Sequence, residues 1–190
     1  MSREANSLPF ATRDDLEAWL SEHHATQTEL WVKVYKKDSG IPSVTWEDCV
    51  IAALAWGWID GVKNALDDTA WLQRLTPRKP RSNWSKKNVA HAEKLIAEGR
   101  MQPAGMAHVE AARADGRWDA AYAASSEMEI PEDFLDALKK DKTAKATFDG
   151  LTKSHLFAIY YRLHSAKRPE TREKRKAAML ERLARGEKPV

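Results

Sequence analysis

Apolar residues recur along this chain with two different periods, and these periods predict its elements. Residues 29–37 alternate apolar with polar or aromatic side chains, a period of two that predicts a β-strand. Two further runs, 58–63 and 69–76, are rich in β-branched and aromatic residues and lie five residues apart. Because so short a connection favours a hairpin, the three runs together predict a small antiparallel sheet of three strands.

Helical spacing covers most of the remaining chain. Thr12 and Thr45 each stand three residues before an aspartate, and this pattern is typical of a helix N-terminus. A helix is therefore expected after each threonine. Further helices are predicted to begin at Pro131 and to cover residues 86–98, 101–114, 144–151, 154–164 and 169–185.

These elements predict the α+β class, with a three-stranded antiparallel sheet packed by helices and a helical C-terminal half. The length of 190 residues suits one domain with a buried core. We expect a single domain over residues 1–190, with an α+β portion at 1–115 and a helical portion at 116–190. The helix-breaking pair Asp115-Gly116 marks the boundary between the two portions.

The composition is that of an ordinary globular protein, with 43% hydrophobic and 31% charged residues. No apolar run approaches the roughly 18 residues that span a bilayer, and no secretory signal is evident at the N-terminus. The single cysteine, Cys49, excludes an intramolecular disulfide. We therefore expect a cytoplasmic protein, and we interpret Cys49 as a small buried apolar residue because no nearby histidine supplies a base.

Charge is distributed unevenly, although the net charge is only +3. Residues 74–94 carry seven basic residues and one acidic residue, and residues 162–188 carry ten basic and four acidic residues. Segregation of this kind favours anionic partners. The alternative, that these lysines and arginines simply lie on solvated helix faces, remains open from the sequence.

The first candidate site is an aromatic and basic cluster around the predicted hairpin and the loop after it. Arginine binds carboxylate or phosphate through a bidentate fork, tryptophan stacks on planar groups, and asparagine supplies hydrogen bonds. In the alternative, Asp60 pairs with Arg74 or Arg78 to hold the loop, and the tryptophans fill the core. The candidate ligand-binding residues are Trp58, Asp60, Arg74, Arg78, Ser82, Trp84 and Asn88.

The second candidate site lies on the last predicted helix and just before it. Arg168, Arg172, Arg175 and Arg182 follow one another at spacings of four, three and seven, which predicts a single row on the helix. Such a row suits phosphates or an acidic protein, and the alternative is a solvated amphipathic helix. The candidate anion-binding or partner-binding residues are Lys167, Arg168, Arg172 and Arg175.

Motifs of established chemistry do not appear in the sequence. None of the six histidines has zinc-ligand spacing relative to a cysteine or another histidine. The chain has no nucleophile-elbow, P-loop or dinucleotide fingerprint. We therefore predict no metal and no cofactor, and the sequence leans against an enzyme without deciding the matter.

Several short motifs resemble the YdeI/OmpD-associated family. They are Trp56–Gly61, Arg74–Arg78, Ser82–Ser85, Asn88, Gly99–Met101 and Ala166–Arg175. Together they extend over nearly the whole chain. The resemblance implies a link to bacteriocin protection, to porins and to tolerance of cationic antimicrobial peptides. It implies no reaction, cofactor or catalytic residue.

We therefore expect a non-enzymatic protein that binds a small anionic or aromatic ligand, or an acidic protein partner. One alternative is a nucleic-acid-binding protein that uses Trp31, Lys33, Tyr35 and Lys37 on an exposed strand face, although the low net charge disfavours it. The other is an enzyme that acts on a small anionic substrate with Asp60 as base. The oligomeric state is not predicted.

Overall fold

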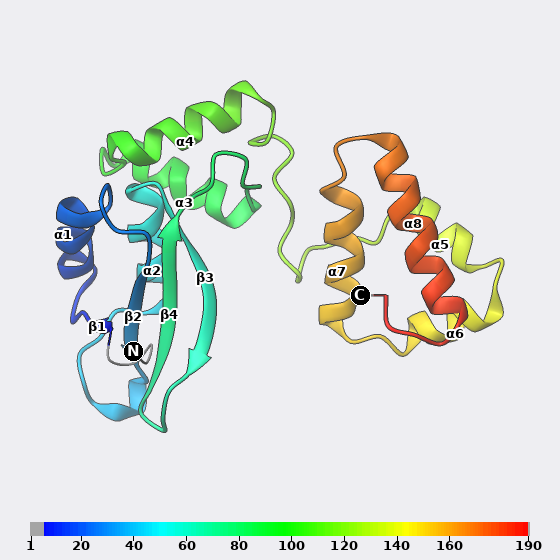
Figure 1. Cartoon of the computed structure of the whole chain (residues 1–190), viewed down its shortest axis with the longest axis horizontal. Coiled ribbons are helices and arrows are strands. Elements are labelled where there is room, and N and C mark those ends of the chain that lie inside the picture. The colour runs from blue at the N-terminus through cyan, green and yellow to red at the C-terminus, as the bar shows by residue number, and fades with distance from the viewer. Residues whose placement is uncertain (1–5, 190) are drawn as a thin grey trace. The chain divides into compact units, whose positions relative to one another are not determined.

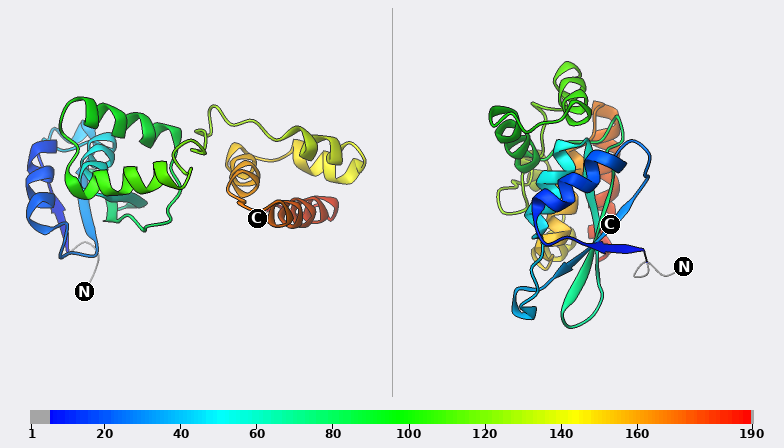
Figure 2. Two further views of the ribbon diagram at one scale, coloured as in Figure 1. Left: turned by 90° about the horizontal axis from the view of Figure 1, so that it is seen from above. Right: turned by 90° about the vertical axis from the view of Figure 1, so that its left-hand side faces the viewer.

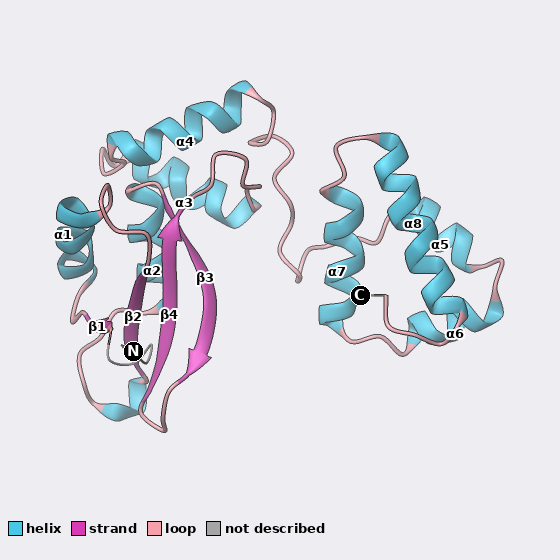
Figure 3. Cartoon of the chain, in the orientation of Figure 1, coloured by secondary structure: helices cyan, strands magenta, loops and turns pink. Residues whose placement is uncertain are grey.

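A single four-stranded sheet lies in the N-terminal part of the chain (Figures 1 and 3). Its spatial order is β1-β2-β4-β3, with β1 parallel to β2 and the other two pairs antiparallel. The strands are β1 (Ser7–Pro9), β2 (Leu30–Tyr35), β3 (Trp58–Ala65) and β4 (Ala70–Pro77).

The prediction of three antiparallel strands was therefore wrong in number and direction, although the hairpin of β3 and β4 and its pairing with β2 are antiparallel. The added strand β1 has only three residues, too few to show a period of two. Its pairing of Ser7 with Trp31 arises from tertiary contact, which no local pattern reveals.

Four helices and a short 3-10 turn, η1, accompany this sheet. Thr12 and Thr45 both form full capping boxes, in which the hydroxyl accepts from the backbone of Asp15 or Asp48 and the carboxylate accepts in return. The two predicted helix starts are thus confirmed. The elements are α1 (Arg13–His23), η1 (Lys37–Ser39), α2 (Trp46–Ala55), α3 (Lys86–Ala97) and α4 (Pro103–Ala114).

The core of this part lies between the sheet and the first two helices. Successive side chains of a strand point to opposite faces, so the apolar residues Leu30, Val32 and Val34 of β2 all enter this core. Leu16 and Leu20 of α1 meet them from the helical side, and both are fully buried. The period of two in the sequence therefore decides which face of β2 the helices cover.

The C-terminal part contains helices and no strand among its described residues (Figure 3). Helix α8 contacts each of the other three helices, and the fully buried Phe134, Leu138 and Ile159 lie in their shared core. The predicted helical half is thereby confirmed. Its elements are α5 (Glu132–Leu138), α6 (Lys142–Asp149), α7 (Lys153–His164) and α8 (Pro169–Ala184).

The computed structural model describes residues 6–189, and they fall into two compact units that divide between Ala120 and Ala121. Figure 2 gives two further views of the elements in each unit. The single domain expected over residues 1–190 stays a prediction. Over the described range, no helix is long and apolar enough to cross a membrane.

Helix α4 approaches α2 at Gly105, and this contact gives a stability test. A Cβ atom at Gly105 would meet the backbone oxygen of Leu54 at 2.6 Å and that of Ala55 more closely still. We expect Gly105→Ala to lower the free energy of unfolding by about 1–3 kcal/mol, since a packed backbone cannot yield. Gly61→Ala is the control, because its Cβ would have its nearest contact at 3.6 Å. Equal thermal unfolding midpoints for the two variants would contradict this packing.

Candidate functional site

The two tryptophans of the first predicted site are both buried, with 1% of Trp58 and 2% of Trp84 exposed. Trp58 lies in the sheet core, where its Nε1 donates to the backbone oxygen of His24 at 3.1 Å. The ring of Trp19 meets it edge-on at 6.2 Å. Trp58 is therefore part of the core that joins α1 to the sheet.

Asp60 and Arg74 lie on opposite faces of the sheet. Asp60 pairs in register with the buried Leu75, so Arg74, the preceding residue of β4, points the other way. Arg74 Nε donates to Glu29 Oε2 at 2.9 Å, and Asp60 accepts from Trp46 Nε1 at 3.3 Å. The pleat thus separates two residues that the sequence had placed in one site.

Arg78 and Trp84 do come together. The guanidinium carbon of Arg78 lies 4.0 Å from the Trp84 ring centre, and its Nη1 donates to the backbone oxygen of Asn83 at 3.0 Å. The ring of Trp118 lies 4.9 Å from that of Trp84 at a tilt of 58°, and Arg113 lies over Trp118. Only 3% of Arg78 is exposed, so the stack of Arg78 on Trp84 holds a desolvated cation against an aromatic face.

A second buried arginine, Arg117, ties the same loop from the end of α4. Its Nε donates to both carboxylate oxygens of Asp115 at 2.7 Å, and its Nη1 donates to the backbone oxygen of Ser82 at 2.8 Å. Burial and then the charges of Arg78 and Arg117 lower the pKa of His108 below its ordinary value. Sequence reasoning missed Arg117, because nothing in its local pattern shows that it is buried.

The remaining residue of this set lies in the first turn of α3. The backbone nitrogen of Asn88 donates to Ser85 Oγ at 3.1 Å, a helix cap. The contacts described here hold the loop between β4 and α3 in place. A ligand site built from this set stays a prediction.

Cys49 is fully buried in the sheet core. Burial, followed by the charges of Asp48 and Asp60, raises the pKa of its thiol to about 12. Because the thiolate is the nucleophile, this thiol is inert at neutral pH. The interpretation of Cys49 as a buried apolar residue is confirmed.

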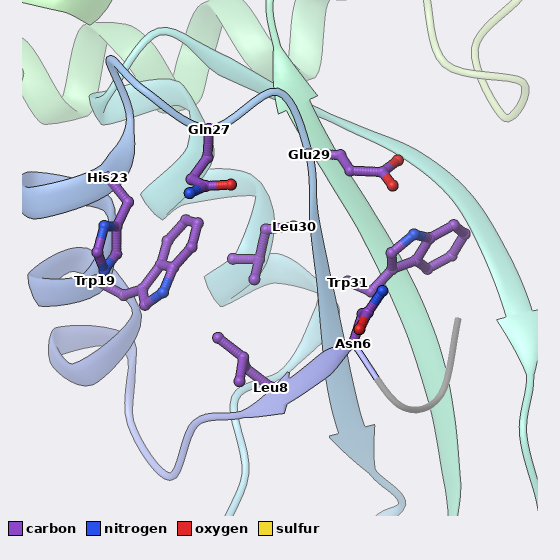
Figure 4. Close-up of a pocket in the computed structure, with 8 residues that line it drawn as sticks. All are labelled: Asn6, Leu8, Trp19, His23, Gln27, Glu29, Leu30 and Trp31. Carbon is purple, nitrogen blue, oxygen red and sulfur yellow. The ribbon is translucent and has the colours of Figure 1, made fainter. Parts of the chain in front are cut away.

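A cavity of about 430 Å³ opens beside the edge strand, between α1, β1 and the start of β2. Figure 4 shows Trp19 and His23 of α1 on one side of β2, and Glu29 and Trp31 on the other. Glu29, which lines this cavity, is the ion-pair partner of Arg74. Trp31 is only 6% exposed and cannot serve as the open stacking surface that the nucleic-acid alternative requires.

In the C-terminal unit, a groove of about 350 Å³ runs along α8. Basic side chains from α7 and α8 surround an apolar floor. Arg175 donates to the backbone oxygen of Arg162 at 2.8 Å and to Ser165 Oγ at 3.2 Å, which holds the end of α7 against α8. The lining residues are Arg162, Thr171, Lys174, Arg175, Ala178, Met179, Arg182 and Pro189.

The predicted arginine row therefore divides between two faces of α8. Arg175 and Arg182 line the groove, whereas both terminal nitrogens of Arg172 donate to Asp133 of α5, at 2.8 and 2.7 Å. Arg168 is the N-cap residue of α8, and both it and its neighbour Lys167 are exposed. Lys174 and Arg162 were missed as site residues. The helical spacing of residues 171, 175, 178 and 182 could have identified this face.

The stack around Arg78 generates a prediction about stability. We expect Arg78→Ala to lower the free energy of unfolding by about 2–4 kcal/mol, because it removes a desolvated cation–π contact and a charge-assisted hydrogen bond. Arg81→Ala, at an exposed residue of the same loop, should change it by no more than about 0.5 kcal/mol. Urea unfolding of both variants measures the difference. Comparable losses would show that Arg78 does not pin the loop.

The ion pair between α5 and α8 predicts acid sensitivity. Hydrogen bonds from Arg172 and then Lys176 hold the pKa of Asp133 well below its ordinary value of 3.8. Because the pKa of Asp133 is lower in the folded state, its ionised carboxylate stabilises the fold above pH 3.8. This stabilisation is lost as the pH falls through the folded-state pKa. Asp133→Asn should therefore cost about 1 kcal/mol or less at pH 7, since Asp133 is 41% exposed and screened.

The same variant should lose less stability than the wild type on acidification below about pH 4. Unfolding measured at several pH values checks this slope, with Asp136→Asn as the control from the same helix. An unchanged slope in Asp133→Asn would contradict the assignment.

Two family models match this chain. Residues 8–108, just over half of its length, match a family described as a domain of unknown function, DUF8412. Residues 127–186 match the family described as bacteriocin-protection, YdeI or OmpD-associated, OmdA. Comparison with curated proteins and with solved structures gave no significant match.

The resemblance seen in the sequence is confirmed for the C-terminal unit, where the motif Ala166–Arg175 lies within the matched residues. The motifs Trp56–Gly61 and Arg74–Arg78 instead fall in the segment that the other family model matches. The chain therefore belongs to the DUF8412 family through residues 8–108, and its residues 127–186 match the YdeI/OmpD-associated family.

Proposed function

We propose that this chain is a non-enzymatic, cytoplasmic protein of the YdeI/OmpD-associated type that binds an acidic protein segment in the groove along α8. The observation that carries the proposal is the grouping of Arg162, Lys174, Arg175 and Arg182 around an apolar floor. The groove residues 162–182 also lie within the segment that matches this family.

The chemistry of the groove favours a carboxylate-bearing partner with an apolar side chain. Lys174 and Arg162 are exposed, so both can reach an incoming carboxylate. Arg182 Nε lies 3.6 Å from Glu187 Oε2, and Arg175 is held by α7, so these two arginines are already oriented. The exposed Ala178 gives the floor an apolar surface, and Met179 beneath it is 2% exposed and belongs to the core.

The cytoplasmic placement rests on the single buried cysteine, since stable disulfides are a feature of oxidising compartments. The link to cationic peptides comes from the family's description and enters here as a proposal. A basic groove repels cationic peptides. We therefore propose that any such tolerance is indirect, through an acidic protein that this chain binds.

The test is fluorescence anisotropy with a labelled peptide of alternating glutamate and leucine. We expect saturable binding by the wild type that weakens as salt is raised. The charge reversal Arg162→Glu with Lys174→Glu should weaken it by about tenfold or more, because both substitutions place repulsive charges at the rim.

The matched control reverses Lys142 and Lys153, which are exposed and lie outside the groove. Its affinity should stay within about threefold of the wild type. Equal losses in the two double variants, or no binding by the wild type, would refute the groove. Tighter binding of a labelled single-stranded oligonucleotide than of the peptide would favour the nucleic-acid alternative.

A further inference from the structure

A second polar cavity, of about 450 Å³, lies in the N-terminal unit and is independent of the groove on α8. Three helices and the segment after α3 surround it, and it lies within the size range of ligand pockets. Ile51 and Leu95 give it an apolar wall. It is lined by Arg13, Glu47, Ile51, Ala90, His91, Lys94, Leu95, Glu98 and Arg100.

Two arginines at one end of this cavity share a single well-shielded carboxylate. Arg100 Nη2 donates to both oxygens of Glu17 at 3.1 Å, and Arg13 Nε lies 3.4 Å from the same group. Among the residues that the structure describes, one further acid, Asp14, pairs with these arginines; it lies 3.5 Å from Arg100 and is 89% exposed, so water screens the pair. Of the two carboxylates that face the two arginines, Glu17 is therefore shielded and Asp14 is screened by water.

The carboxylates that line the cavity already have cationic partners. Lys87 Nζ lies 3.3 Å from Glu47, and Lys94 Nζ lies 3.8 Å from Glu98. These pairs reduce the repulsion that either glutamate would exert on an incoming anion. Arg13 and Arg100, which share Glu17, are therefore the cations of the wall best placed to meet an incoming anion.

Two residues that line the cavity also carry a buried nitrogen atom without a hydrogen bond. Among the residues that the structure describes, Arg13 Nε and His91 Nε2 are buried without a hydrogen-bond partner. The nearest acid to His91 Nε2 is Glu47, at 3.5 Å. A buried polar group without a hydrogen bond is costly, so an oxygen-bearing ligand that drew these groups toward it would recover part of that cost.

We propose that this cavity binds a small molecule that carries an oxyanion, carboxylate or phosphate, on an apolar body. The oxyanion lies against Arg13 and Arg100, where arginine forks match its geometry. The apolar body lies against Ile51 and Leu95, and a polar edge of the ligand meets His91.

Calorimetric titration with benzoate and phenyl phosphate tests the proposal, with benzamide as the neutral counterpart of similar shape. We expect saturable binding of at least one of the two acids and binding of benzamide that is about tenfold weaker or more. Arg13→Gln should weaken the binding of the acid by a similar factor. Arg81→Gln removes one exposed arginine outside the cavity and should leave the affinity unchanged.

Nuclear magnetic resonance of the wild type locates the ligand without any substitution. This measurement therefore tests the proposal even if Arg13→Gln does not fold. Benzoate or phenyl phosphate should shift the amide signals of Ile51, His91 and Leu95. Shifts centred on Lys174 and Arg182 would place the anion in the groove on α8 and overturn the proposal. Binding of neither acid, or equal binding of benzamide, would also overturn it.

Discussion

The pleat of β2 is the constraint on which the N-terminal unit depends. Alternate side chains of a strand point to opposite faces, so the apolar residues Leu30, Val32 and Val34 must all be covered on one side. Helices α1 and α2 provide that cover, and the capping boxes at Thr12 and Thr45 set where each begins. Packing against the core sets the positions of α1 and α2. The cavity between α1, α2 and α3 is lined mainly by polar side chains of these helices.

Arginine serves two opposite purposes in this chain. Arg78 and Arg117 are desolvated, and each is held by an aromatic face, a carboxylate or backbone oxygens. Burying a charge is costly unless it is paired, and both arginines contact the loop between β4 and α3, Arg78 at Asn83 and Arg117 at Ser82. The arginines of the α8 groove and of the cavity near α1 keep part of their side chains open to water. They are the ones available to a ligand.

Helix α8 shows how one helix divides its charges between structure and a candidate site. Its buried side, with Met179 and Leu183, fills the core of the C-terminal unit. Arg172 and Lys176 lie seven residues before Met179 and Leu183, on the same side of the helix, and pair with Asp133 of α5. The groove face lies about a hundred degrees further round the helix. A seven-residue spacing can therefore align two arginines, while a neighbouring arginine faces a different helix.

The sequence by itself determined the α+β class, the helical C-terminal half, the two capped helix starts and the apolar face of β2 formed by Leu30, Val32 and Val34. Each of these follows from the period of apolar side chains along one element or from the four-residue capping pattern at a helix start. It also gave the inert environment of Cys49, because a lone cysteine on an apolar helix face is most stable buried.

Only the tertiary structure decided the parallel strand β1, the separation of Asp60 from Arg74, and the burial of Arg78 and Arg117. Each depends on which residue, distant in sequence, comes to lie opposite. Spacing places a side chain on a face of its own element, and the desolvation of a charge depends on what packs against that face. The arginines that hold the fold and those that remain open to a partner are therefore distinguished by their surroundings, although the side chain is the same.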